Sequence, residues 1–326
     1  MSGAYFAPAL SFVLAYAIIW WLVTRAAARL PVDTPNDRSL HSTPVPRAGG
    51  IGLHAGAVTA VIVIAPTLTP ELWIAFAMLL AISLIDDFRA LPVRLRLVVH
   101  LSAAAVFVIP QLANPYGMAV AAAAVLATAW MINLYNFMDG SDGLAGGMTL
   151  FGFAFYAMAA WTAGSTGFAL VNAGVAAAAA AFLVFNFHPA RIFLGDAGSV
   201  PLGFLAAAFG LTGWLQRDWT WWFPVLVFSP FIVDASVTLL RRLLSGARIW
   251  EAHRDHYYQR LVQMRFGHRG TAFVEYLVMA ACGLGGLLSM KTGLDSVVVL
   301  LAASVFYSAA IAGIEYAWHE RRLPDA

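Results

Sequence analysis

The chain has 326 residues, of which 61% are hydrophobic and only 11% are charged. A soluble globular protein carries roughly 25% charged residues, so this composition excludes an ordinary soluble domain and predicts an all-α polytopic membrane protein. Its long apolar runs do not show the alternation over about 10 residues that β-barrel strands require. The formal net charge of +2 is too small to indicate nucleic-acid binding.

The apolar runs predict about eleven membrane-spanning helices in a single domain covering 1–326, with ten as the alternative because two runs are short. The first run resembles a signal peptide, but Arg25 and Arg29 follow it in place of a cleavage site, so we expect it to be retained. The predicted spans are 5–24, 51–69, 71–85, 95–112, 117–134, 143–163, 167–187, 199–215, 220–240, 271–290 and 295–316.

The basic residues lie almost entirely on one side of the predicted membrane. Of the 19 Lys and Arg residues, 17 lie in loops after odd-numbered spans or in the C-terminal tail, and the other side holds only Arg217 and Lys291. The positive-inside rule therefore predicts a periplasmic N-terminus and a cytoplasmic C-terminus. The polar motifs lie in the same loops, so we expect cytoplasmic active-site loops at about 25–50, 86–96, 135–142, 187–199 and 241–270.

The loop after the first span has the sequence DTPNDRSLHSTPVPRAGGIG. Its cationic or hydrogen-bonding residues Arg38, His41 and Arg47 are candidate contacts for an anion such as a lipid phosphate. The loop is also rich in turn-forming residues, so it is expected to be irregular.

The third span ends in the adjacent carboxylates Asp86 and Asp87, which repel each other unless a cation lies nearby. One interpretation is a site for Mg²⁺ or for a base that acts on a phosphate. The alternative is a solvated pair at a helix end. Arg94 and Arg96, which follow, are expected to be ordinary positive anchors at the membrane surface.

The segment NLYNFMDGSDGLAGG combines two amides, Asn133 and Asn136, with two carboxylates, Asp139 and Asp142, between strongly apolar runs. Carboxylates at the edge of an apolar run are costly unless a metal, a cation or water meets them. The three-residue spacing places each pair on one face if the backbone is helical, whereas the glycines favour a tight turn. We expect a nucleotide or phosphate site here, with a polar capped turn as the alternative.

The segment FNFHPARIFLGDAGSVPLG places Asp196 immediately before the eighth span. Gly195 and Ser199 leave backbone N–H groups accessible, and a helix N-terminus favours an anion. Asp196 is interpreted as a metal ligand beside a phosphate, with a helix-capping aspartate as the alternative. Asn186 and Arg191 are further candidate substrate contacts.

The loop after the ninth span gathers basic and titratable side chains, namely His253, Arg254, His256, Arg260, Arg265, His268 and Arg269. Such groups suit a nucleotide diphosphate, and His253, His256 and Arg260 are the candidate contacts. No cysteine accompanies them, so the spacing does not predict a zinc site. A basic loop that binds anionic lipid is the alternative. His188, in the preceding motif, is expected to be structural.

Together these motifs resemble the polyprenyl-phosphate N-acetylhexosamine-1-phosphate transferase superfamily, the bacterial glycosyltransferase family 4. The superfamily includes undecaprenyl-phosphate GlcNAc-1-phosphate transferases and phospho-MurNAc-pentapeptide transferases. The resemblance covers 33 to about 270 and implies an inner-membrane enzyme of ten or eleven helices with a cytoplasmic cleft. The matching pieces are, in chain order, PNDRSLHSTPVPRAGG, IDDF, NLYNFMDGSDGLAGG, FNFHPARIFLGDAGS and HRDHYYQRL.

The resemblance implies transfer of a sugar-1-phosphate from a UDP-N-acetylhexosamine to undecaprenyl phosphate, with release of UMP. It also implies a requirement for Mg²⁺, with Mn²⁺ as a substitute. The aspartate pair of the family falls on Asp86 and Asp87, its metal-binding aspartate on Asp196, and its nucleotide-site aspartates on Asp139 and Asp142. We therefore expect Asp86 and Asp87 to act in catalysis, and Asp196 with Asp87 to bind the metal.

Two positions depart from the family pattern. The motif D-D-x-x-D has Ala90 at its fifth position, and the motif H-x-H-H retains only His256. The altered loop resembles the branch that initiates O-antigen or another cell-envelope glycan with 6-deoxy sugars, so UDP-GlcNAc, UDP-FucNAc and UDP-QuiNAc are all candidate donors. The alternative function is a cation-coupled transporter, which would place ionisable groups at midplane depth. The sequence leaves open whether the protein forms a homodimer.

Overall fold

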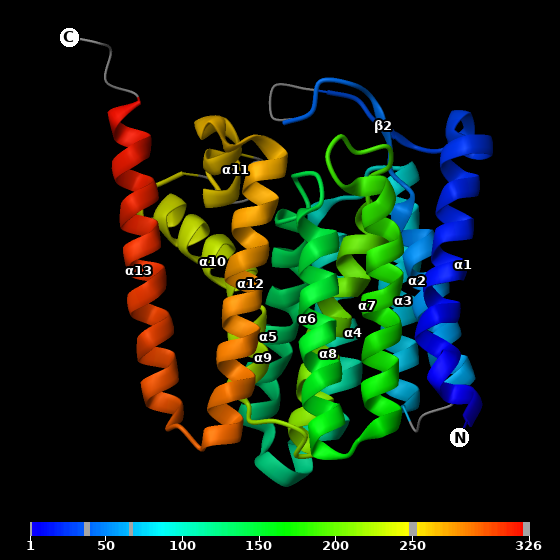
Figure 1. Cartoon of the computed structure of the whole chain (residues 1–326), viewed down its shortest axis with the longest axis vertical. Helices are drawn as coiled ribbons and strands as arrows, with labels where there is room; N and C mark the ends of the chain where they lie inside the picture. The colour runs from blue at the N-terminus through cyan, green and yellow to red at the C-terminus, as the bar shows by residue number, and fades with distance from the viewer. Residues whose placement is uncertain (1, 36–39, 65–67, 248–252, 322–326) are drawn as a thin grey trace.

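The computed structural model describes residues 2–35, 40–64, 68–247 and 253–321. These residues form a bundle of long helices that run between two ends of the molecule, with the N-terminus at one end and the C-terminus at the other (Figure 1). The strands in the described part are β1 (Val32–Asp33) and β2 (Val45–Pro46), which pair antiparallel in the loop before α2. The prediction of an all-α polytopic membrane protein is confirmed.

The long helices follow the predicted apolar runs closely. Their bounds are α1 (Ala7–Trp21), α2 (Gly49–Ile64), α3 (Pro70–Phe88), α4 (Val93–Tyr116), α5 (Met118–Phe137), α6 (Leu144–Ala163), α7 (Thr166–Asn186), α8 (Asp196–Leu215), α12 (Gly267–Thr292) and α13 (Ser296–Glu320). The shorter helices are α9 (Trp222–Val227), α10 (Ser229–Leu244) and α11 (Tyr257–Leu261).

Eight helical segments in the described part of the chain are long and apolar enough to cross a membrane. Three of the predicted spans fall outside that group for different reasons. Helix α2 has only 16 residues. Helix α3 carries Glu71, Asp86 and Asp87, and the segment predicted as one helix at 220–240 is broken. The number of spans and the sidedness of the membrane therefore stay predictions.

The break between α9 and α10 has a local cause. Pro230 has no backbone N–H to donate, so it fits the first turn of a new helix and not the middle of a continuous one. Phe228 leaves the regular helical geometry, and the Ser229 hydroxyl donates to the Leu226 carbonyl at 2.6 Å. Beyond the break, α10 runs obliquely to its neighbours (Figure 1).

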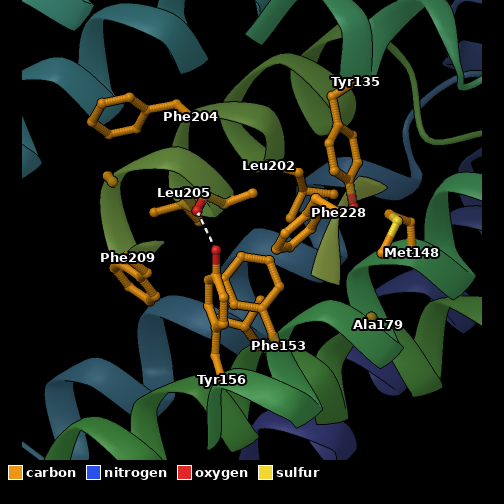
Figure 2. Close-up of a cluster of buried hydrophobic side chains, with 14 of the residues drawn as sticks. Tyr135, Met148, Phe153, Tyr156, Ala179, Leu202, Phe204, Leu205, Phe209 and Phe228 are labelled. Carbon is orange, nitrogen blue, oxygen red and sulfur yellow. Dashed lines mark hydrogen bonds between the residues drawn. The ribbon is translucent and has the colours of Figure 1, made fainter. Parts of the chain in front are cut away.

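The interior is filled by aromatic and small side chains. Figure 2 shows Phe153, Tyr156, Phe209 and Phe228 packed together where α6, α8 and the α9–α10 break meet. The buried Tyr156 hydroxyl donates to the Ala206 carbonyl at 3.1 Å, so this polar group does not remain unpaired in the core. This packing gives the loops at one end of the bundle a rigid base.

Small residues bring α2 and α8 into direct backbone contact near the loop end. A Cβ atom on Gly50 would lie 2.3 Å from the Cα atom of Gly198, so no larger residue fits there without movement. The Gly50 amide donates to the Leu194 carbonyl at 2.9 Å, and the Phe193 amide donates to the Pro46 carbonyl at 2.8 Å. The β-ribbon loop is thereby held against the α7–α8 loop.

Candidate functional site

A polar cavity of about 320 Å³ lies among the loops at this end of the bundle. Its walls come from the β-ribbon loop, the α5–α6 turn, the α7–α8 loop, α11 and the start of α12. Its lining residues are Asp33, Leu40, His41, Arg47, Asn136, Asp139, Gly140, Ser141, Asp142, Asn186, Phe193, Gly195, Asp196, Gln259 and His268. Carboxylates and cationic or hydrogen-bonding groups therefore face one space.

Asp87, the last buried residue of α3, holds the first turn of α8. Its Oδ1 accepts a hydrogen bond from the Asp196 amide at 3.0 Å, and its Oδ2 accepts one from the Ala197 amide at 2.9 Å. The N-cap residue of α8 is Gly195, which has no side chain to bind these free amides, so a carboxylate from another helix does so. Asp87 thereby fixes the position of Asp196.

Gly195 has a backbone that other residues rarely adopt, with φ of 76° and ψ of 168°. A Cβ atom at this position would also lie 3.0 Å from Asp87 Oδ2. The glycine therefore allows both the turn into α8 and the close approach of the Asp87 carboxylate.

Asp86 and Asp196 share one arginine. Arg96 Nη1 lies 2.7 Å from Asp86 Oδ2 and 3.3 Å from Asp196 Oδ2. The Leu91 amide donates to Asp86 Oδ1 at 2.6 Å, which fixes the other carboxylate oxygen. Arg96 was expected to be a surface anchor, and it is in fact a structural part of the site.

Asp139 lies half-buried on the cavity wall, at the end of α5. Burial, together with the negative charges of Asp196, Asp87 and Asp33, raises the pKa of the Asp139 carboxyl well above its usual range. Four aspartates, Asp33, Asp139, Asp142 and Asp196, line the cavity together with Arg47, His41 and His268. Nearby, the Ser199 hydroxyl donates to Asn136 Oδ1 at 3.3 Å and links α5 to α8.

A second part of the cavity wall is built around Asp142. Its Oδ2 lies 2.7 Å from His188 Nδ1 and accepts a hydrogen bond from the Ala190 amide at 3.1 Å. Next to it, the Gly143 amide donates to Asn186 Oδ1 at 2.9 Å, and the Asn186 side-chain amide donates to the Ile192 carbonyl at 2.9 Å. These bonds tie the α5–α6 turn to the α7–α8 loop.

Helix α11 is held over the end of α5 by a buried aspartate of α10. Asp234 accepts hydrogen bonds from the Tyr257 amide at 3.0 Å and the Tyr258 amide at 2.8 Å, and its Oδ1 lies 3.1 Å from His256 Nδ1. The Tyr258 hydroxyl donates to the Phe137 carbonyl at 3.2 Å. This placement brings Gln259, and not His256, to the cavity.

The comparisons with known proteins agree with this architecture. Residues 70–213 match Glycosyl transferase family 4. The chain is 28% identical to a probable undecaprenyl-phosphate N-acetylglucosaminyl 1-phosphate transferase of Bacillus subtilis, over 82% of this chain and 79% of the relative. It is 29% identical to a decaprenyl-phosphate N-acetylglucosaminephosphotransferase of Mycobacterium tuberculosis, over 90% and 85% of the two chains.

A phospho-N-acetylmuramoyl-pentapeptide-transferase of Desulforudis audaxviator is 30% identical, over 81% of this chain and 90% of the relative. The chain belongs to the polyprenyl-phosphate N-acetylhexosamine-1-phosphate transferase superfamily. The resemblance predicted from the motifs is confirmed, and this superfamily member is a membrane transferase.

Within this transferase, the predicted site residues fall into two groups. Those that line the cavity are His41, Arg47, Asn136, Asp139, Asp142, Asn186, Gly195 and Asp196. Those that lie around it without lining it, among the described residues, are Asp86, Asp87, Asn133, Arg191, Ser199, His253, His256 and Arg260. Arg38 lies outside the described residues. The functional role of each residue stays a prediction.

Several members of the second group have structural partners. The Asn133 side chain donates to the Ala129 carbonyl at 2.7 Å, one turn earlier in α5. Arg191 donates to the Val184 carbonyl at 3.1 Å and lies over the Phe185 ring. Arg260 Nη1 lies 2.8 Å from Glu315 Oε1.

His253 stacks on His256, with ring centroids 5.0 Å apart. Burial, with the nearby His256 and Arg242, lowers the pKa of His253 to about 4, so this imidazole is neutral near neutral pH. A neutral ring supplies a hydrogen-bonding group to the basic loop but no charge.

The cavity also has lining residues that sequence analysis did not select, among them Asp33, Phe193, Gln259 and His268. Asp33 begins the polar loop DTPNDRSLHSTPVPRAGGIG, two residues before the first matching piece, whereas Phe193 and Gln259 lie inside matching pieces. These positions were the available signal in the sequence. His268 was noted only as part of a basic loop. Its contact with the α5–α6 turn depends on how α12 enters the bundle.

The oxygen donors on the cavity wall fit the Mg²⁺ that the family implies. Asp139 and Asp196 contribute carboxylates and Asn136 contributes an amide to the same space. Mg²⁺ prefers such oxygen ligands, and a divalent cation would balance the charge of the aspartates that line the cavity. Asp87 already accepts a backbone hydrogen bond on each oxygen, so it holds the first turn of α8, which carries Asp196.

Proposed function

We propose that this transferase moves an N-acetylhexosamine-1-phosphate from a UDP-sugar to undecaprenyl phosphate, releases UMP and so initiates O-antigen, lipopolysaccharide or another cell-wall or envelope glycan. UDP-GlcNAc is the first candidate donor, because the named Bacillus and Mycobacterium relatives transfer N-acetylglucosamine phosphate. UDP-FucNAc and UDP-QuiNAc stay candidates because of the altered His256 loop. The proposed location is the bacterial inner membrane, with the cavity facing the cytoplasm.

The observation that carries this proposal is the single cavity in which aspartates face Arg47 and two histidines. A diphosphate needs both a cation held by carboxylates and direct hydrogen-bond donors. The 17 basic residues predicted on this side of the membrane support the proposed orientation.

In the proposed reaction, an oxygen of the lipid phosphate attacks the β-phosphorus of the UDP-sugar. The bond from that phosphorus to the bridging oxygen breaks, and UMP leaves with this oxygen. A phosphate nucleophile is already anionic near neutral pH, so no strong general base is required. When bound, Mg²⁺ supplies charge neutralisation for the diphosphate oxygens.

The residues of the chain then have separate roles in the proposal. Asp196 and Asp139 would hold the ion, and Asp87 keeps Asp196 in place through the first turn of α8. Asp86 with Arg96 orients the same carboxylate from the other side. Arg47 and His41 bind phosphate oxygens, and Asp142 with Asn186 forms the nucleotide-facing wall.

The test uses purified full-length protein with undecaprenyl phosphate, Mg²⁺ and a panel of radiolabelled UDP-sugars, scored by lipid-linked product and UMP. Asp196→Asn keeps the shape of the side chain but removes its charge, so UMP release should fall by about 1,000-fold or more. The matched control is Asp218→Asn, because Asp218 is also buried but lies in the loop between α8 and α9.

Full activity of Asp196→Asn would refute the metal role of Asp196. Reconstituted uptake of a cation-coupled substrate without UMP formation would instead support the transporter alternative. The ordered carboxylates at one end of the helices favour the transferase, since transporters bind substrates near the bilayer midplane.

A further inference from the structure

Three ligand side chains from separate loops meet at the rim of the cavity. Asp142 comes from the α5–α6 turn, His188 from the α7–α8 loop, and His268 from the first turn of α12. One ligand atom from each lies within 4.8 Å of the other two. We infer that these three residues, called here the Asp-His-His cluster, form a binding site for a divalent transition metal of the Zn²⁺ class, separate from the oxygen donors around Asp196.

The hydrogen bonds of His268 define which ring nitrogen carries the lone pair, and a metal would displace the Ser141 hydroxyl, which lies 2.9 Å from His268 Nδ1. The Asp142 backbone amide can only donate, and it donates to His268 Nδ1 at 3.3 Å. Nδ1 therefore carries a lone pair, and the ring proton is on Nε2, which donates to the Leu40 carbonyl at 3.1 Å. An imidazole whose second nitrogen is held by a backbone carbonyl is the usual arrangement of a histidine metal ligand.

His188 presents its ring to the same carboxylate. His188 Nδ1 lies 2.7 Å from Asp142 Oδ2, and His268 Nδ1 lies 3.9 Å from Asp142 Oδ1. Ligand atoms at about 2.0 Å from a tetrahedral zinc ion are about 3.3 Å apart, a value between these two distances. A bound cation would replace the proton that His188 and Asp142 share.

Among the three side chains of the Asp-His-His cluster, His188 is the most exposed. The Asp142 and His268 side chains are 7% and 11% exposed, whereas His188 is 43% exposed. The two imidazole rings stack in parallel, with centroids 5.2 Å apart and an angle of 8°. A metal can thus enter past His188, and the fourth coordination position stays available to water or to a ligand in the cavity.

The ligand atoms of the Asp-His-His cluster differ in type from those of the proposed Mg²⁺ site. Two imidazole nitrogens and one carboxylate suit Zn²⁺ and similar transition metals, whereas Mg²⁺ prefers oxygen ligands and keeps its water. The hydrogen bond between Asp142 and His188 accounts for one contact, and the Ser141 hydroxyl and the Asp142 amide account for the orientation of His268 Nδ1. The case for a metal therefore rests on the three ligand atoms that lie within 4.8 Å of one another and on the type of donor that each residue supplies.

The test is direct metal binding by the full-length protein in detergent, with no nucleotide sugar or polyprenyl phosphate present. The protein is equilibrated with Zn²⁺ in excess Mg²⁺, and zinc per chain is measured by mass spectrometry. Co²⁺ is then bound in place of Zn²⁺, because its visible absorption reports whether imidazole nitrogens bind it in a site with few ligands. We expect one tightly held Zn²⁺ per chain and Co²⁺ absorption bands that Zn²⁺ removes.

His268→Ala and His188→Ala should each raise the Kd for Zn²⁺ by at least about 10-fold, since each removes a ligand. His319→Ala is the matched control, because His319 is an exposed histidine in the last turn of α13. Circular dichroism can show whether His268→Ala lowers the unfolding temperature. In that case His188→Ala remains informative, because the His188 side chain is 43% exposed. Unchanged Zn²⁺ affinity in the His188→Ala, His268→Ala double variant, or no Zn²⁺ retained by the wild type, would overturn the inference.

The proposed function also uses Asp142, but the two proposals can fail separately. Asp196→Asn should leave the Kd for Zn²⁺ within about 3-fold of the wild type while it lowers UMP release. Loss of transfer with intact Zn²⁺ binding therefore concerns the Mg²⁺ site, and loss of Zn²⁺ binding alone concerns the Asp-His-His cluster.

Discussion

The two walls of the cavity use aspartates in different ways. On the α8 wall, Asp87 accepts two backbone amides and leaves Asp196 to face the cavity. On the α5–α6 wall, Asp142 is itself a cavity residue and is surrounded by His188 and His268. The first wall offers oxygen atoms, and the second offers nitrogen atoms beside one carboxylate.

The difference shows that a carboxylate in a motif can either hold neighbouring groups in place or line the cavity itself. Asp87 is buried and acts on the backbone of a neighbouring helix, so its removal should misplace other groups. Asp142 reaches the cavity, so its removal should weaken binding at that wall. Substitutions on the two walls can therefore be compared by whether kcat or KM changes.

After Asp196→Asn, the largest effect is expected for Asp87→Ala. The substitution leaves two amides of α8 without their acceptor, so Asp196 shifts and kcat should fall by about 100-fold, with a smaller change in KM. Thermal unfolding should also show a loss of about 1–3 kcal/mol. Asp295→Asn is the control, because Asp295 caps α13 away from the cavity. A kcat within twofold of the wild type would show that Asp87 does not position the site.

A smaller effect on the same wall is expected for Gly195→Ala. The backbone at φ of 76° and ψ of 168° is strained for alanine, and the added methyl group approaches Asp87 Oδ2. The cost should be about 1–3 kcal/mol in the free energy of unfolding, with a fall of kcat of about 10-fold or more. Denaturant unfolding measures the free energy of unfolding, and UMP release measures kcat. Gly117→Ala is the comparison, because its positive φ has no atom within 4 Å of the added carbon.

On the other wall, Asp142→Asn should raise the KM for the UDP-sugar about 10-fold and change kcat little. The substitution removes a charged hydrogen-bond acceptor that contacts His188 and the Ala190 amide, and such bonds contribute about 1.5–3 kcal/mol. Steady-state kinetics over a range of UDP-sugar concentrations gives both constants. A fall in kcat with unchanged KM would mean that the two walls do not differ in role.

The smallest effect is expected for Arg260→Ala. This arginine lies beside Glu315 of α13 and is not a lining residue, so UMP release should change by less than about 3-fold. The sequence suggested the opposite, a direct substrate contact. A rise of 10-fold or more in KM, measured in the same assay, would restore that suggestion and place the α11 loop in the substrate site. Gln259→Ala, which alters a lining residue one position earlier, is the paired variant.

The helices could be located from hydropathy because apolar runs of sufficient length have few alternatives in a membrane. The run at 220–240 was predicted as one helix but forms two, because Pro230 lies within it and starts a new helix. Helices α3 and α4 also extend further than predicted. The charged residues at Asp86, Asp87, Arg94 and Arg96 were treated as loop but continue their helices into the site.

The converging loops could also be predicted, because motifs after odd-numbered spans must lie on one side. The contacts of individual side chains could not. Nothing local to Asp86 and Asp87 tells which of them binds the amides of a helix more than 100 residues later. The pairing of Arg260 with Glu315 and of His268 with Asp142 likewise depends on how distant helices cross.

The close contact between the start of α2 and the loop before α8 also has a consequence for biogenesis. The amides of Gly49 and Gly50 find their acceptors, the Phe193 and Leu194 carbonyls, only after α7 has been synthesised. During insertion these amides must bond to water, which is available because Gly49 and Gly50 are the first two residues of α2 and follow a polar loop. The early helices can therefore enter the membrane first, and the loop before α2 can complete its contacts later, when the second half of the chain arrives.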